Sequence, residues 1–166
     1  MAVLFLSERV GSRFEEAVVC VREGATKKMS DAIENLQRAL ERAAAIRPKV
    51  GGFPYLAETL RQAGVTRNLW ALPACQSIFV TASGHVVMQG TPLVMGAADV
   101  PAFDREALIK VLSIDQAGES TFQEFLEASW KAGVMGYDVD FAARTVRYFG
   151  CNGGEYVEAY PVVEIA

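Results

Sequence analysis

The sequence predicts an α+β fold made by internal duplication. In this prediction a unit of two helices followed by a three-stranded antiparallel meander occurs twice, and the two units pack as one pseudo-symmetric domain. The first observation is a repeat: when the chain is shifted by 69 residues, positions 53–94 align without a gap with positions 122–163. The second is that AGV occurs in both copies, each time after an amphipathic helical stretch and before strand-like segments. One three-stranded meander is only marginally stable, so we expect the two units to pack together.

Two pairs of identical residues in the alignment, one of glycines and one of prolines, stand at positions where the predicted backbone favours that residue type. Gly64 and Gly133 each follow an apolar helical stripe, at the position where a helix ends in a left-handed residue. Pro92 and Pro161 each close the last strand-like segment, because proline has no N–H to donate to a strand ladder. The repeat therefore follows the secondary structure.

The second copy has the clearer local signals. Thr121 and Glu124 have the spacing of a capping box, so a helix is expected to begin there and to end at Gly133. Alternation of polar and apolar residues, broken by turn residues, then predicts three strands. We place these strands at 137–141, 145–149 and 156–161.

The first copy repeats this plan with weaker signals. Pro54 stands where the first turn of a helix tolerates proline, and Gly64 ends that helix. The strands are expected at 67–72, 76–81 and 85–90. A further helix is predicted before each copy, at 31–46 with Asp31 and Glu34 as a cap pair, and at 104–115.

These elements divide the chain into three parts. The first repeat is expected at 29–98 and the second at 99–166, the two forming one globular domain. Residues 1–28 lie outside the repeat and are an N-terminal extension with one short helix candidate. Because Met29 directly precedes a good helix start, this extension is either native or an addition to the native chain.

Composition excludes several classes of function. The net charge is −4 and the pI is near 5.1, without a cluster of basic residues, so we expect no nucleic-acid partner. The apolar runs are too short to span a membrane, so no membrane association is expected. Three cysteines without a CxxC pair indicate free thiols in a reducing compartment, which predicts a cytoplasmic protein. The chain contains no phosphate loop or dinucleotide fingerprint, and we expect no cofactor.

One set of residues in the second copy is distinctive when taken together: Gln116-Ala117-Gly118, Phe122, Phe125, Ala132-Gly133-Val134, Tyr137, Arg144, Tyr148, Gly150, Gly153, Glu155 and Glu158-Ala159-Tyr160-Pro161. With these residues the sequence resembles a bacterial family of unknown function that is often labelled phage envelope protein-like or YbcV-like. The resemblance covers about residues 30–165 and implies the same small α+β fold, but no activity or catalytic residues.

The candidates for catalysis are two thiols and one imidazole. Cys151 stands in the glycine-rich turn FGCNGGE, where it is either a reactive thiol or an inert turn residue. Cys75 stands in LPACQS and is either a nucleophile or a small core residue. His85 is the single histidine, so any Cys–His pair must use it; the alternative is a surface histidine. With one histidine and no clustered cysteines, no metal site is expected.

The candidates for ligand binding are aromatic and acidic side chains that break the symmetry of the repeat. Tyr156, Glu158 and Tyr160 share one face of the last strand, where they either bind a ligand or partner or simply pack. Trp70 is opposite a valine in the second copy and is either a binding residue or part of the core.

The second copy is also the more acidic one, and two of its carboxylates have two alternative roles. Asp138 and Asp140 share one strand face and are either a general acid–base pair or a solvated pair. In the second case they are expected to pair with Arg144 and Arg147 across the hairpin.

Three functions remain open after this reading. The first is a non-enzymatic binding or regulatory module that holds a small molecule or protein partner at the seam between the copies or on the face of Tyr156, Glu158 and Tyr160. The second is a small thiol-dependent enzyme with Cys151 or Cys75 as nucleophile. The third is a phage-related structural or assembly protein, which predicts a homo-oligomer.

Overall fold

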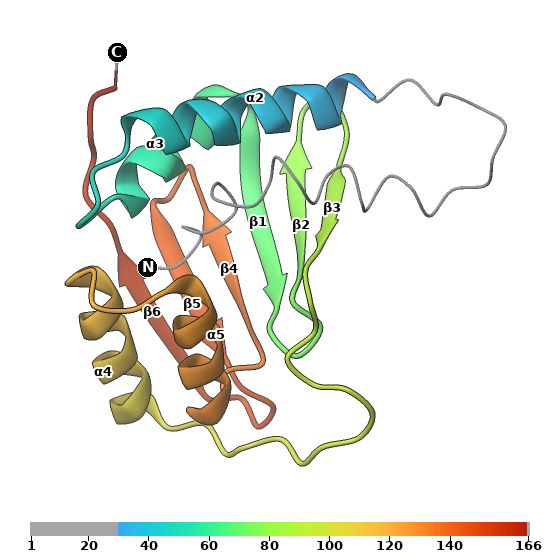
Figure 1. The fold of residues 1–166 in the computed structure, drawn as a ribbon, viewed down its shortest axis with the longest axis vertical. Helices are drawn as coiled ribbons and strands as arrows, with labels where there is room; N and C mark the ends of the chain where they lie inside the picture. Colours follow the sequence, from blue (N-terminus) through green and yellow to red (C-terminus); the bar gives the residue numbers. More distant parts are fainter. Residues whose placement is uncertain (1–29, 166) are drawn as a thin grey trace, which may run out of the picture.

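The computed structural model describes residues 30–165, and its elements confirm the α+β fold. Residues 1–28, their helix candidate and Met29 lie outside the described residues. The elements are α2 (Asp31–Ile46), α3 (Phe53–Gln62), β1 (Val65–Ala71), β2 (Gln76–Thr81), β3 (Val86–Gln89), α4 (Arg105–Gln116), α5 (Phe122–Lys131), β4 (Gly136–Asp140), β5 (Thr145–Phe149) and β6 (Glu155–Ala159). Each repeat thus forms two helices and then three strands (Figure 1).

The two meanders join into one six-stranded antiparallel sheet with the order β3-β2-β1-β4-β5-β6. At the junction of β1 and β4, Leu69 lies opposite Asp138. These two residues are also aligned by the 69-residue shift, so a pseudo-twofold axis passes between them. The sheet is continuous because the first strand of each repeat pairs with its own counterpart.

The duplication is also visible in the backbone conformation, at residues of types that rarely adopt a positive φ. Cys75 and Arg144 are non-glycine residues with positive φ, at 45° and 55°, and they are 69 positions apart. Gly64 and Gly133 have φ of 85° and 78° and end their helices as expected. A left-handed residue at matched positions in both hairpins confirms the internal repeat.

The helix boundaries follow from their caps. The capping box of Thr121 and Glu124 is formed, as predicted. The helix at 31–46 has the predicted bounds, but its cap is Ser30, whose side chain accepts from the N–H of Ile33. The Asp31–Glu34 cap pair was therefore wrong, because Asp31 is already the first residue inside the helix.

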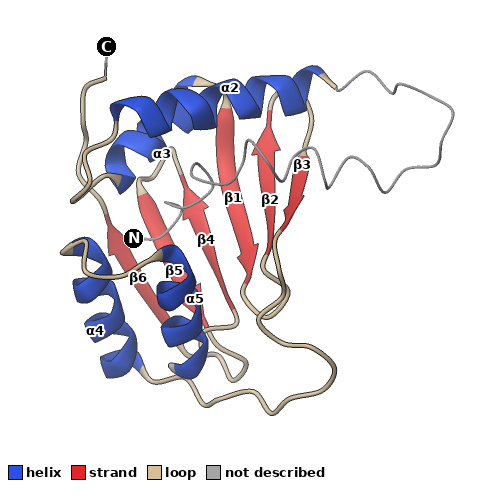
Figure 2. Cartoon of the chain, in the orientation of Figure 1, coloured by secondary structure: helices blue, strands red, loops and turns tan. Residues whose placement is uncertain are grey.

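The helices cover one face of the sheet (Figure 2). Along each strand, side chains therefore alternate between the helix-covered face and the open face. The helix-covered face holds most of the sheet's share of the core, including Trp70, Phe79, Tyr137 and Tyr148.

The helix pairs do not follow the symmetry of the sheet. In Figure 1, α2 lies across the strand ends of the first repeat, whereas α4 runs alongside α5. As a result the α2–α3 and α4–α5 connections lie near each other on the side of β6 (Figure 1). This departure from symmetry opens the pocket described below.

Candidate functional site

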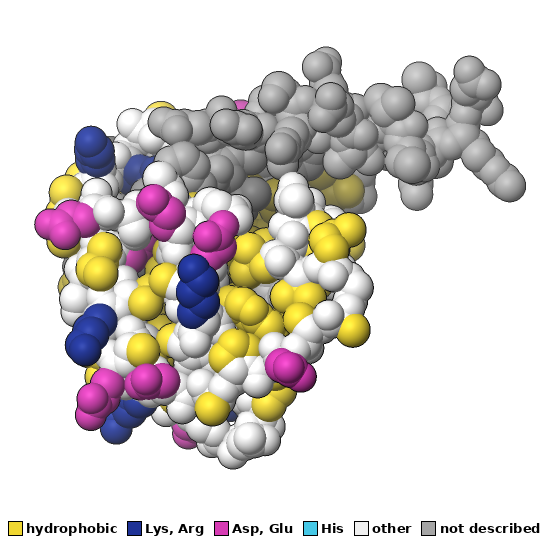
Figure 3. Space-filling view, turned by 60° about the horizontal axis from the view of Figure 1, so that its bottom comes forward, with side chains coloured by type: hydrophobic (Ala, Val, Ile, Leu, Met, Phe, Trp, Pro, Cys, Tyr) yellow, Lys and Arg dark blue, Asp and Glu magenta, His cyan; other side chains and the backbone are white. Residues whose placement is uncertain are grey.

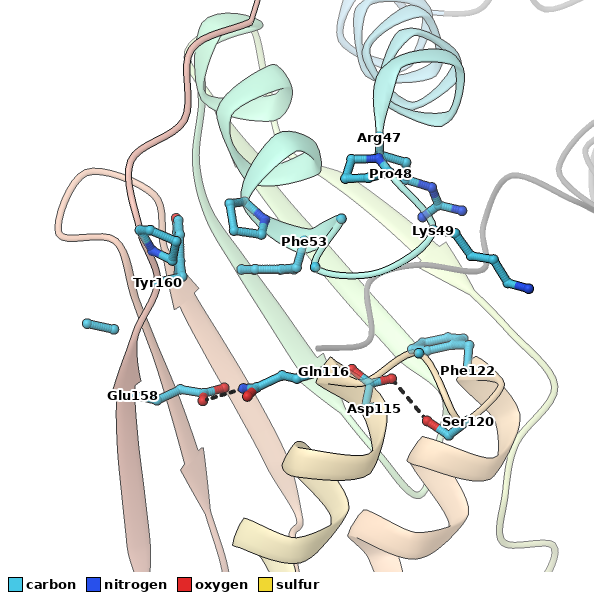
Figure 4. A pocket seen from close by; sticks show the side chains of 16 residues that line it. Arg47, Pro48, Lys49, Phe53, Asp115, Gln116, Ser120, Phe122, Glu158 and Tyr160 are labelled. Carbon is cyan, nitrogen blue, oxygen red and sulfur yellow. Dashed lines mark hydrogen bonds between the residues drawn. The ribbon is translucent and has the colours of Figure 1, made fainter.

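A pocket of about 610 Å³ lies at the seam between the two repeats. We call it the seam pocket. The first repeat lines it with the α2–α3 connection and the start of α3, and the second repeat lines it with the α4–α5 connection and the end of β6 (Figure 4). The lining residues are Arg47, Pro48, Lys49, Gly51, Gly52, Phe53, Pro54, Asp115, Gln116, Gly118, Ser120, Phe122, Glu158, Ala159, Tyr160 and Pro161.

Glu158 is a carboxylate of this pocket that accepts two side-chain hydrogen bonds. It is half-buried on the helix-covered face of β6, and its Oε1 accepts from the hydroxyl of Tyr148 at 3.1 Å. Its Oε2 accepts from the Nε2 amide of Gln116 at 3.1 Å. Burial raises the pKa of Glu158, while the two donors oppose that rise. The carboxylate is thus fixed in place by groups from β5 and α4.

Tyr160 forms an aromatic wall beside Glu158. Its ring is buried and meets the ring of Phe53 edge-on, with centroids 5.0 Å apart. Burial raises the pKa of the Tyr160 hydroxyl to about 12, so the hydroxyl stays protonated at neutral pH. Phe53 belongs to the first repeat and Tyr160 to the second, so this contact joins the two sides of the pocket.

The charged side chains of the seam pocket are segregated by repeat. Arg47 and Lys49 come from the α2–α3 connection, and Asp115 and Glu158 come from the second repeat. In Figure 4, Glu158 lies at one end of the pocket and the two cations at the other, while Asp115 lies between them, beside Ser120 and Phe122.

Two of the ligand-binding candidates line this pocket and two do not. Glu158 and Tyr160 line it, although they were selected from strand alternation alone. Tyr156 is half-buried further along β6, with the guanidinium of Arg105 5.3 Å from its ring centroid. Trp70 is buried and meets Phe122 edge-on at 5.4 Å, so it supports a lining residue from behind.

Sequence reasoning missed two residues that complete the site. Tyr148 and Gln116 both donate to Glu158, but their strand and helix positions give no sign of a shared partner. Trp70, Tyr137, Tyr148 and Tyr156 occupy paired positions on four neighbouring strands, which forms an aromatic row beneath the helices. Sequence reasoning selected Trp70 and Tyr156 separately, but it did not predict that the four rings lie side by side.

The structure does not assemble the predicted Cys–His pair. Cys75 is buried just before β2, and burial raises the pKa of its thiol, which disfavours the reactive thiolate. His85 is exposed beyond the far end of β2, and the six residues of that strand span about 20 Å. Cys151 is exposed in the β5–β6 turn, which the pseudo-twofold places at the opposite ends of the strands from His85.

The acidic pair of β4 also differs from expectation. Asp138 pairs with Arg67 of the first repeat rather than with Arg147, which pairs with Glu155. Asp140 accepts from the backbone N–H groups of Ala142 and Ala143, while Arg144 faces Glu58. Pairing across the hairpin with Arg144 and Arg147 was therefore wrong: one carboxylate joins the repeats and the other caps a turn.

Charged and hydrophobic side chains are unevenly distributed over the described surface, and two kinds of feature are absent from the described residues. On the face in Figure 3, acidic and basic side chains are interspersed on one side and hydrophobic side chains gather on the other. Among residues 30–165, no helix has the length and apolar character needed to cross a membrane. Within the same residues, no group of three or more metal-ligating side chains comes together.

Comparison with known proteins places the chain in a family. Residues 43–158 match the family described as protein of unknown function (DUF1398). The chain belongs to the DUF1398 family. It is similar to the uncharacterized proteins Rv2012 of Mycobacterium tuberculosis (strain ATCC 25618 / H37Rv) and Mb2035 of Mycobacterium bovis (strain ATCC BAA-935 / AF2122/97). Each is 54% identical to it over 138 residues, which is 83% of this chain and 84% of the relative. The resemblance to a family of unknown function is thereby confirmed, whereas its phage envelope-like label stays a prediction.

Proposed function

We propose that this DUF1398 protein is a non-enzymatic binding protein whose small-molecule ligand occupies the seam pocket. The observation that carries the proposal is the pocket itself: about 610 Å³, built from both repeats and containing a carboxylate held by two donors. Ligand pockets commonly fall in this range of volume and combine apolar walls with a few fixed polar groups.

The walls supply the apolar area that such a ligand would cover. Phe53, Phe122 and Tyr160 line the pocket together with three prolines. These side chains are held before any ligand arrives, because Phe53 packs on Tyr160 and Phe122 packs on Trp70. A preformed site loses little conformational entropy on binding.

Binding also fits the duplicated fold. The symmetric positions hold the sheet together, whereas the seam pocket arises where the helix pairs depart from symmetry. The aligned positions in its lining carry different residues: Arg47 aligns with Gln116, and Gly51 with Ser120. Glu158 aligns with Gln89, which lies at the opposite edge of the sheet.

The test is a thermal-shift screen against a library of small metabolites, followed by calorimetric titration of the hits. We expect at least one compound to raise the melting temperature, and Glu158→Gln to weaken its binding. The matched control is Glu155→Gln, which removes the same charge from the open face of the same strand. A library without hits, or hits that bind both variants equally, would contradict the proposal.

A further inference from the structure

Glu158 is a half-buried carboxylate that no cationic side chain of the described residues neutralises. Its two donors, the hydroxyl of Tyr148 and the amide of Gln116, are neutral groups. None of the ion pairs formed within residues 30–165 includes Glu158. Because a charge that is removed from water is normally paired in proteins, this carboxylate attracts a cation that enters the pocket.

The carboxylate of Glu158 also has room for a further donor. An ionised carboxylate has about four acceptor positions, and the two donors occupy one position on each oxygen. Tyr148 and Gln116 hold the group in one orientation, and its side chain lines the pocket. An N–H donor of a ligand therefore meets an acceptor that is already fixed, which lowers the entropy cost of binding.

The lining next to Glu158 is apolar. Ala159, Tyr160 and Pro161 follow it along the chain and line the pocket with it. The N–H of Tyr160 donates to the carbonyl of Arg144 at 3.1 Å, so the ladder of β6 continues to this residue. The α-carbons of Glu158 and Tyr160, two residues apart on one strand face, are therefore about 7 Å apart. In Figure 4, Tyr160 and Phe53 lie on the same side of Glu158.

The other charged residues of the lining do not neutralise Glu158. The carboxylate of Asp115 accepts from the hydroxyl of Ser120 at 3.2 Å, and Asp115 and Arg47 each have a further interaction partner. Lys49 is exposed, and Figure 4 shows Asp115 between it and Glu158. A ligand that enters at β6 therefore meets a negative charge beside an apolar wall.

We propose that the seam pocket binds a small primary amine with an apolar body. The ammonium group donates to the carboxylate of Glu158, and the apolar body lies against Tyr160 and Phe53. This inference rests on the proposed function of the pocket as a binding site. The same ammonium chemistry is found in amino acids, which the test below distinguishes from simple amines.

The experiment is a calorimetric titration of the full chain with 2-phenylethylamine and with hexylamine. Each amine is compared with the alcohol and the carboxylate that have the same apolar body. We expect each amine to bind about tenfold or more tightly than its alcohol, because a hydrogen bond between charged groups is stronger than one to a neutral group. The carboxylates should bind more weakly than the alcohols, since Glu158 repels them.

Phenylalanine is titrated beside 2-phenylethylamine, because it adds a carboxylate next to the ammonium group. We expect it to bind more weakly, since this carboxylate would lie close to Glu158. Equal binding of the two compounds would make an amino acid the source of the ammonium group.

A charge-removing variant assigns the preference for amines to one side chain. In Glu158→Gln the difference in affinity between each amine and its alcohol is expected to disappear, while the affinity for the alcohol remains. The matched control is Glu155→Gln, which removes an exposed carboxylate of the same strand that does not line the pocket. This control should keep the wild-type preference, and thermal unfolding verifies that both variants fold.

The outcomes separate this inference from the proposed function. A preference for the amines that Glu158→Gln removes supports the inference. It is wrong if neither amine binds more tightly than its alcohol, if a carboxylate binds most tightly, or if the preference survives in Glu158→Gln. In these cases the proposed function still stands when another library compound binds in a manner that depends on Glu158. If no compound of any class binds, both proposals fail together.

Discussion

Arg67 of the first repeat forms an ion pair with Asp138 of the second repeat, across the central strands β1 and β4. Its Nε donates to Oδ1 of Asp138 at 3.2 Å, and one of its terminal nitrogens donates to Oδ2. Asp138 occupies the position that Leu69 holds in the first repeat, and the pseudo-twofold passes between these two residues. At the centre of the symmetric sheet, one copy therefore contributes an apolar side chain and the other a charge that needs a partner.

This ion pair predicts that replacing Arg67 lowers the stability of the protein as long as the Asp138 carboxylate is present. Arg67→Met leaves the largely buried Asp138 carboxylate without its guanidinium and is expected to cost about 1–3 kcal/mol in the free energy of unfolding. The double variant Arg67→Met/Asp138→Leu, which copies the leucine of the first repeat, should recover most of that loss. Urea unfolding measures both.

The control for this pair is Arg147→Met. Arg147 and Glu155 are both about half exposed, at 49% and 56%, so losing this pair should cost less than about 0.5 kcal/mol. If the double variant were no more stable than Arg67→Met, the carboxylate would not be the source of the loss.

Alanine substitutions of the two glycines at the helix ends distinguish the energetic cost of a left-handed backbone from the cost of a steric clash. Gly64 and Gly133 have similar positive φ, but a Cβ at Gly64 would meet nothing within 4 Å. A Cβ at Gly133 would lie 2.6 Å from the Cα of Phe103 and closer still to the carbonyl of Ala102. Gly64→Ala is therefore expected to cost about 1–2 kcal/mol, the left-handed penalty alone. Gly133→Ala should cost clearly more in the same unfolding measurement, and equal losses would contradict this account of the packing.

The two thiols within residues 30–165, Cys75 and Cys151, are expected to differ in reactivity. Cys151 is exposed, whereas Cys75 is buried and its pKa is raised, so less of it is thiolate at a given pH. Alkylation of the native protein at pH 8, followed by peptide mass analysis, should modify Cys151 readily and Cys75 only after unfolding. Fast modification of native Cys75 would restore the thiol-dependent enzyme as a hypothesis.

The raised pKa of Glu158 predicts a pH-dependent effect of its replacement. In the folded protein this carboxyl holds its proton to higher pH than in the unfolded chain, whose value is near 4.5. Ionisation therefore lowers the stability of the wild type as the pH rises through and above that value. Glu158→Gln cannot ionise, so its stability relative to the wild type should increase from pH 4 to pH 7 in urea unfolding. A difference that is the same at both pH values would contradict the burial of this carboxyl.

Most of the fold could be predicted from local signals in the sequence. The capping box at Thr121, the helix at 31–46 and the glycines at 64 and 133 lie where short-range physics places them. The 69-residue repeat also predicted two equivalent meanders. The pairing of β1 with β4, which joins the two meanders, could not be predicted from the sequence, because pairing between counterpart strands depends on packing rather than on residue spacing.

The site was predictable only in part. Strand alternation selected Glu158 and Tyr160, because they share one face of the last strand and break the symmetry of the repeat. The other half of the pocket comes from the α2–α3 connection, which reaches β6 only because α2 crosses the strands. Helix crossing angles depend on the whole interface between helix and sheet, and no single motif reports them. The Cys–His pair fails to form for a different reason, because Cys75 and His85 lie beyond opposite ends of β2, whose six residues span about 20 Å.

The most direct test of the central claim is an NMR titration of the ¹⁵N-labelled protein with the tightest-binding compound of the library. Binding in the seam pocket predicts that the largest amide shifts fall in residues 47–54, 115–122 and 158–161, on both repeats at once. Largest shifts on the open face of the sheet, or in the β2–β3 turn around His85, would show that the ligand binds elsewhere and would contradict the account.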